Sequence, residues 1–150
     1  MKVNIPVVYR EKLQQRTLQQ MEGLGEALSE MQFQDNTVNF VFVNGEYSDF
    51  DKKMLTSCVL VNKMGKPITE IHGRIELNFR NIQGQIAFYV IDLLEAFMGV
   101  LQADEGLFFT VKIPVKGLDA DREVNYSEIA GRFEDVRVTF LEEESQQEAE

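Results

Sequence analysis

The sequence predicts a mainly-β protein: an antiparallel β-sandwich of about seven strands, preceded by an N-terminal α-helix. Two observations predict the sandwich. Apolar residues alternate with a period of two through most of the chain after residue 37, and turn signals recur at intervals of roughly ten residues. A third observation, an apolar stripe at helical spacing near the N-terminus, predicts the helix. A small closed barrel is the alternative architecture.

The N-terminal region, residues 1–36, is predicted to be an extended segment followed by a helix over residues 9–31. The apolar stripe has spacings of three and four and consists of Leu13, Thr17, Met21, Leu24, Leu28 and Met31. Gly23 and Gly25 each weaken a helix by about 1 kcal/mol relative to alanine. The helix therefore needs tertiary packing, and either the chain's own sandwich or a partner protein can provide it.

The β-domain is predicted to span residues 37–141. Strands are expected at 37–43, 53–61, 69–79, 85–91, 107–115 and 136–140, with a further short strand near Val124. The clearest alternation is at 69–79, which predicts a strand with one wet face. Asn44-Gly45 is read as a hairpin turn, and Cys58–Val61 as a run covered on both faces. Residues 92–101 fit a short helix capped by Asp92, a strand or an irregular crossover.

The remaining residues, 142–150, form an acidic tail that is expected to be disordered. Five of its nine residues are glutamates, and the whole chain has a formal net charge of -10. Such a charge repels phosphate backbones and anionic lipids, so nucleic-acid binding is not expected. No stretch approaches the ~20 apolar residues needed to span a bilayer, so membrane insertion is not expected either. Cys58 is the single cysteine, the N-terminal residues do not form a signal peptide, and the expected location is the cytoplasm.

No recognisable catalytic or metal-binding pattern is present, and we predict neither enzyme activity nor a cofactor. A nucleophilic pair would need Cys58 beside His72, the sole histidine. Cys58 lies in an apolar strand and His72 on a wet strand face, so a buried thiol and a solvated imidazole are the simpler interpretations. Asp119, Asp121 and Glu123 faintly resemble the start of a calcium loop, but the later glycine and glutamate are missing.

One resemblance to a known family is carried by residues 53–115. Its motifs are Val61-Asn62-Lys63, Lys66-Pro67-Ile68, the alternating strand 71–77, the segment 84–87 that begins at Gly84, and Phe109-Thr110-Val111-Lys112-Ile113-Pro114. In this order they resemble the small immunoglobulin-like sandwich domains of Gram-positive bacteria, of the FxLYD and SLAP type. The resemblance implies an immunoglobulin-like sandwich of bacterial origin, an interaction or assembly role, and no catalytic residues.

The leading functional hypothesis is a non-enzymatic protein-interaction module, possessing a protein partner or associating with itself. The candidate partner-binding residues are Met21, Leu24, Leu28 and Met31, because methionine-rich apolar faces adapt to partner surfaces. Exposed sheet edges could also accept a partner strand. One alternative is a small-ligand-binding barrel with a pocket lined by Phe40, Phe42, Phe88 and Phe109. The other is an enzyme of unrecognised type that acts through Asp119 and Asp121.

Overall fold

The computed structural model describes residues 1–12 and 15–142, and in this part of the chain the protein is mainly β, as predicted. The predicted disordered tail therefore lies outside the described residues, except for Glu142. The elements, in chain order, are β1 (Val3–Asn4), the 3-10 helix η1 (Val7–Lys12), α1 (Gln15–Ser29), β2 (Val38–Ser48), β3 (Lys53–Asn62), β4 (Ile68–Phe79), β5 (Gln85–Ile86), β6 (Tyr89–Leu93), α2 (Glu95–Met98), β7 (Gly106–Lys116), β8 (Arg122–Asn125), the 3-10 helix η2 (Tyr126–Glu128) and β9 (Ile129–Phe140).

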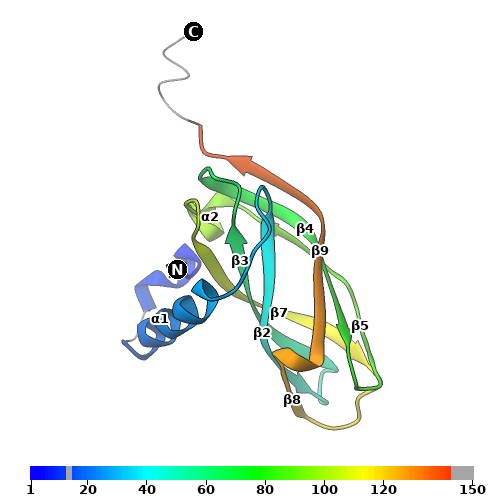
Figure 1. The fold of residues 1–150 in the computed structure, drawn as a ribbon. Helices are drawn as coiled ribbons and strands as arrows, with labels where there is room; N and C mark the ends of the chain where they lie inside the picture. The colour runs from blue at the N-terminus through cyan, green and yellow to red at the C-terminus, as the bar shows by residue number, and fades with distance from the viewer. Residues whose placement is uncertain (13–14, 143–150) are drawn as a thin grey trace.

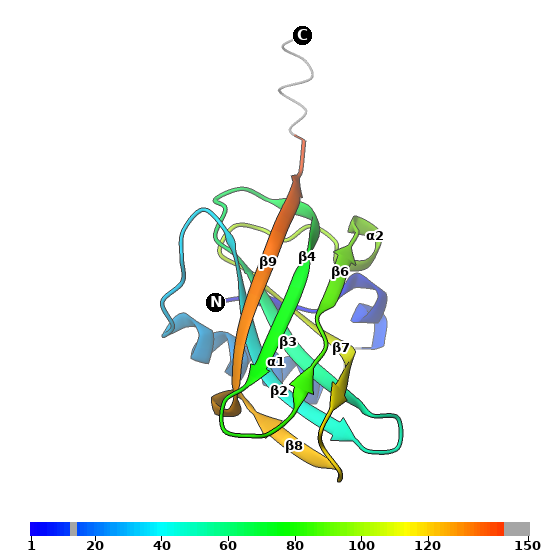
Figure 2. The same cartoon turned by 90° about the vertical axis from the view of Figure 1, so that its right-hand side faces the viewer.

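These strands form two sheets that pack face to face. Sheet A has the order β1-β7-β3-β2-β8, with β5 also paired to β7, and sheet B has the order β6-β4-β9. All pairings are antiparallel except that of β1 with β7. Helix α1 lies on the face of sheet A that points away from sheet B (Figure 1), and Figure 2 shows the three strands of sheet B from outside. The layout fits the predicted sandwich rather than a closed barrel.

The main core lies between the two sheets and is built by alternate residues of the long strands. In β4, Ile71, Ile75 and Leu77 are buried in this core, whereas His72, Arg74 and Glu76 on the other face are only half-buried, so the predicted alternation is confirmed. Met54 of β3 and Ile113 of β7 face them from sheet A and are fully buried. The burial of these side chains is the main force that joins the two sheets.

A second, smaller core lies between sheet A and α1. Val59 and Val61 of β3 pack there with Leu28 of the helix, while Cys58 and Leu60 of the same strand face the main core. The prediction that the run Cys58–Val61 is covered on both faces is therefore confirmed. The N-terminal helix is shorter than predicted, because the region begins with η1 and the α-helix ends at Ser29.

The predicted turn at Asn44-Gly45 is wrong. Strand β2 continues through both residues to Ser48, with a register shift between Phe42 and Asn44, and the chain turns at residues 49–52 instead. Gly45 is needed here for close packing against the neighbouring strand and not for a turn. A Cβ at Gly45 would lie 2.5 Å from the sulfur of the buried Met54 on the neighbouring strand.

Three other boundaries differ from the expectation. The predicted strand 85–91 is two strands, because β5 pairs with β7 in sheet A whereas β6 pairs with β4 in sheet B. The last strand begins at Ile129 instead of residue 136, and β8 accounts for the short strand expected near Val124. The uncertain segment contains the four-residue helix α2, for which Leu94, and not Asp92, is the N-cap residue.

The two glycines of α1 have different surroundings, and this yields a matched test of how the helix is docked. No atom lies within 4 Å of a Cβ built on Gly23, whereas a Cβ on Gly25 would collide with the backbone carbonyl of Met1. We expect Gly23→Ala to raise the free energy of unfolding by about 0.5–1 kcal/mol through helix propensity. Gly25→Ala should lower it by about 1–3 kcal/mol because the N-terminal segment must shift.

Urea denaturation of both variants measures the difference. Equal stabilisation by the two substitutions would show that the N-terminal segment does not pack on Gly25 as described.

Candidate partner-binding groove

The four predicted partner-binding residues of α1 have different environments. Leu28 is only 1% exposed and packs on Val59 and Val61 in the protein's own second core. Leu24 is half-buried at the margin of the same core, and Met21 is also half-buried. Met31, just after the end of the helix, is 47% exposed. The stripe therefore anchors the helix at Leu28 and leaves apolar surface free toward Met31.

This free surface forms one wall of an apolar hollow between α1 and β2. The hollow has a volume of about 340 Å³. Its walls are the apolar residues Leu24, Ala27, Leu28, Met31, Val41, Phe42 and Val43 together with Tyr126. The sheet side of the hollow exists because β2 directs Val41 and Val43 toward the helix.

A second hollow adjoins the first on the sheet B side of β2. Its volume is about 460 Å³. It is lined by Met31, Phe40, Val41, Phe42, Arg80, Tyr126, Ser127, Ile129 and Gly131. The two hollows share Met31, Val41, Phe42 and Tyr126. We call the combined depression the β2-edge groove.

The groove follows a part of β2 that has a neighbouring strand on one side only. Residues 38–42 pair with β3, whereas β8 pairs only with Asn44–Tyr47. After Asn125 the chain leaves the sheet edge through η2, where the Asn125 side chain and Glu128 form a capping box. Within the described residues, no strand therefore pairs with residues 38–43 on the side away from β3. Backbone groups in an antiparallel strand point alternately to its two sides, so about half of them face the groove here.

Tyr126 is the exposed corner of the groove. It is the first residue of η2 and its side chain is 72% exposed. The turn that carries it is held by an ion pair in which Arg122 Nη2 lies 2.7 Å from Glu128 Oε2. An exposed aromatic side chain on a fixed turn is a typical anchor for a protein partner.

The charges around the groove are unequal. Residues 18–48, which supply α1 and β2, contain five acidic residues and neither lysine nor arginine. Three of the five are exposed: Glu22 and Glu26 on the helix, and Glu30 just after its end. Arg80 lies on the opposite wall, where its Nε donates a hydrogen bond to the carbonyl oxygen of Ile129 at 3.2 Å. The helix wall is therefore negative.

The hypothetical Cys–His pair is not assembled. Cys58 is fully buried in the main core, where its Sγ lies 3.6 Å from the carbonyl oxygen of Phe109. Burial raises the pKa of its thiol far above the ordinary value. His72 belongs to sheet B, where its ring nitrogens contact two carboxylates on the outer face.

His72 bridges two strands of sheet B through these carboxylates. Its Nδ1 lies 2.6 Å from Asp92 on β6, and its Nε2 lies 3.3 Å from Glu70 on β4. The hydrogen bond to Asp92 is the main cause that raises the pKa of His72 above its ordinary value of 6.5. The arrangement fixes an edge strand to its neighbour.

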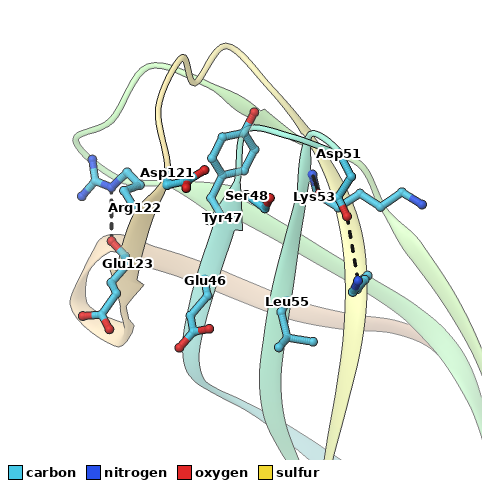
Figure 3. A pocket seen from close by; sticks show the side chains of 10 residues that line it. Glu46, Tyr47, Ser48, Asp51, Lys53, Leu55, Asp121, Arg122 and Glu123 are labelled. Atoms are coloured by element: carbon cyan, nitrogen blue, oxygen red, sulfur yellow. Dashed lines mark hydrogen bonds and ion pairs between the residues drawn. The ribbon is translucent and has the colours of Figure 1, made fainter.

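Of the acidic residues that suggest calcium binding or catalysis, Asp121 and Glu123 line a polar hollow at the far end of sheet A (Figure 3), whereas Asp119 is exposed and does not line it. Asp121 Oδ1 accepts a hydrogen bond from the backbone N–H of Asp49 at 2.7 Å and so fixes the turn between β2 and β3. Glu123 points away from Asp121 in Figure 3, beside Glu46 of the paired strand. Among the described residues, no group of three or more metal-ligating side chains could hold a metal ion.

The four phenylalanines proposed for a ligand pocket do not face one cavity. Phe42 and Phe109 are buried in the main core, and Phe40 packs at its margin against Phe133. Phe88 is 67% exposed in the crossing between β5 and β6, beneath the Arg74 guanidinium. The sequence alternation located Phe40 and Phe42 correctly on one face of β2, but it could not show which sheet that face opposes.

Comparison with known proteins found no match: no family model, curated protein or solved structure corresponds to this chain. No helix in the described part is long and apolar enough to cross a membrane.

Sequence reasoning found the helix side of the groove and missed Tyr126, which lies in a polar, turn-rich segment. The sheet side of the groove did have a sequence signal. Val41 and Val43 alternate with Phe40 and Phe42, which makes both faces of β2 apolar.

The division of the helix stripe predicts two different mutational effects. Leu28→Ala should lower the free energy of unfolding by about 2–5 kcal/mol, because it leaves a cavity in the second core. Met31→Ala should lower it by less than about 1 kcal/mol, because that side chain is half-exposed. Urea denaturation distinguishes them, and equal effects would contradict the assignment of Leu28 to the core and Met31 to the groove.

The raised pKa of His72 predicts a specific dependence of stability on pH. Because its pKa is higher in the folded protein than in the unfolded chain, protonated His72 stabilises the fold fully below pH 6.5. The contribution is lost as the pH rises through the raised pKa. Asp92→Asn should lower the pKa of His72, and His72→Gln should abolish this part of the pH dependence.

NMR titration of the single histidine follows the first effect without overlap, and denaturation at several pH values follows the second. A His72 pKa at or below 6.5 in the unmutated protein would contradict the contact with Asp92.

Proposed function

We propose that this protein is a non-enzymatic interaction module that binds an apolar segment of another protein in the β2-edge groove. The observation that carries the proposal is the meeting of an apolar hollow and a partly polar one at a strand edge with which no described strand pairs, beside the exposed side chains of Met31 and Tyr126. Apolar anchors in a recess, surrounded by polar residues, are the usual centre of a protein-binding surface.

The surroundings of the reactive side chains support a binding role over catalysis. Cys58 is buried without an acid or base beside it, His72 is held between two carboxylates, and Asp121 fixes a turn. The resemblance of residues 53–115 to FxLYD and SLAP domains also implies an interaction role. A cytoplasmic location is part of the proposal, because the one cysteine is a core residue and the fold does not depend on disulfides.

Photo-crosslinking from defined positions tests the proposal in the cells that express the protein. A benzoylphenylalanine at position 31 or 126 lies on the groove and should form a discrete covalent adduct with a partner protein. The same group at position 50 serves as the control, because Phe50 is 98% exposed and lies in the turn between β2 and β3.

A second substitution shows whether such an adduct depends on the groove. Ala27→Arg adds a long charged side chain to the helix wall of the apolar hollow, and it should reduce the adduct at least tenfold. Gln19→Arg adds the same charge to an exposed position of the same helix that does not line the groove, and it should leave the adduct unchanged.

Equal crosslinking from positions 31, 126 and 50, or an adduct that Ala27→Arg does not reduce, would reject the groove as the binding site. An adduct with a second copy of this chain would assign the groove to self-association instead.

A further inference from the structure

We infer that the partner segment binds as an added β-strand along residues 38–43 of β2, with apolar side chains at alternate positions and lysine or arginine between or beside them. This inference rests on the proposed function and adds the conformation and chemistry of the partner. Three independent features of the groove carry it: its backbone, the placement of its two hollows, and its charge.

The backbone of the groove has hydrogen-bonding groups that a strand would use. β8 already extends sheet A beyond β2 at Asn44–Tyr47, and the chain then turns away through η2. A segment in line with β8 would continue the same ladder along the preceding six residues of β2. Main-chain hydrogen bonds of this kind supply affinity in strand addition, and a segment of about six residues is long enough to form them.

The two hollows match the side-chain pattern of a strand. Successive side chains of a strand point to opposite faces of its sheet. One hollow lies on the helix face of the β2 edge, beside Leu24 and Ala27, and the other lies on the sheet B face, beside Ile129 and Gly131. A strand on this edge would therefore place alternate side chains in the two hollows. A helix has its apolar residues on one side and would fill only one of them.

The charge on the helix side of the groove favours lysine or arginine in the partner segment. The exposed carboxylates of Glu26 on α1 and of Glu30 just after it lie on the helix side, where residues 18–48 contain no base, whereas Arg80 lies on the opposite wall. The whole chain has a net charge of -10. Cationic residues in the partner would be attracted to this surface and would accelerate association.

A second copy of this chain is a poor occupant. The β2 edge lies in a recess between Met31 on the helix side and Tyr126 and β9 on the other. Two recessed edges cannot approach each other closely enough to pair, whereas a free extended segment can enter. Two copies would also bring the same acidic surfaces together, which repel each other.

Selection from a phage-displayed library of random dodecapeptides tests the inference on the full-length protein. The library is panned on the unmutated protein after depletion on the Ala27→Arg variant, and Gln19→Arg serves as the control target. Enriched peptides should have apolar residues at every second position, with lysine or arginine in excess over acidic residues. Their binding should weaken at least tenfold on Ala27→Arg, remain unchanged on Gln19→Arg, and decrease with added salt.

Backbone methylation of the best peptide then separates strand addition from simple apolar binding. N-methylation removes one backbone donor without changing a side chain. At positions that pair with β2 it should weaken binding about tenfold or more, and at the intervening positions it should have little effect. This alternation with a period of two is the result expected only for an added strand.

Failure of the strand-addition inference and failure of the proposed binding function would give different experimental results. Groove-dependent peptides that tolerate N-methylation everywhere, or that lose affinity with a helical period, would overturn the inference and leave the groove as a binding site. Failure to enrich any peptide that distinguishes the unmutated protein from Ala27→Arg would overturn the inference and the proposed function together.

Discussion

The structure depends most on the position of β2 between two apolar layers. Phe40 and Phe42 face sheet B, Val41 and Val43 face α1, and the strand pairs with β3 on both sides of a register shift at Val43. A strand with two apolar faces must be covered on both sides, which explains why the helix packs on sheet A. The groove arises where this cover is incomplete, because α1 ends at Ser29 and β8 reaches only to Asn44.

The helix shows how little local propensity contributes to this arrangement. Gly23 and Gly25 weaken α1, yet Gly25 allows the N-terminal segment to approach it closely. The burial of Leu28 against Val59 and Val61 supplies about 1.5–3 kcal/mol that a solitary helix would lack. Residues of the same stripe that remain half-buried or exposed, such as Leu24 and Met31, give the groove its apolar wall.

The sequence predicted those features that depend on a regular period along one strand. The alternation of β4 and the two-sided burial of Cys58–Val61 follow directly from side-chain direction. Prediction from the sequence failed where the role of a residue depends on a neighbour that is distant in the chain. Gly45 was read as a turn signal, but it makes room for Met54, and the switch of the chain between sheets after Ile86 has no local signature. Tyr126 joins the groove only through the tertiary course of η2.

The central claim is that residues 38–43 present an unpaired strand edge, and amide hydrogen exchange of the free protein tests it most directly. The account predicts a period of two along this segment: amides that point to β3 exchange slowly, and those that point to the groove exchange at rates near those of exposed loops. Uniformly slow exchange of all six amides would show that the edge is already covered and would contradict the account.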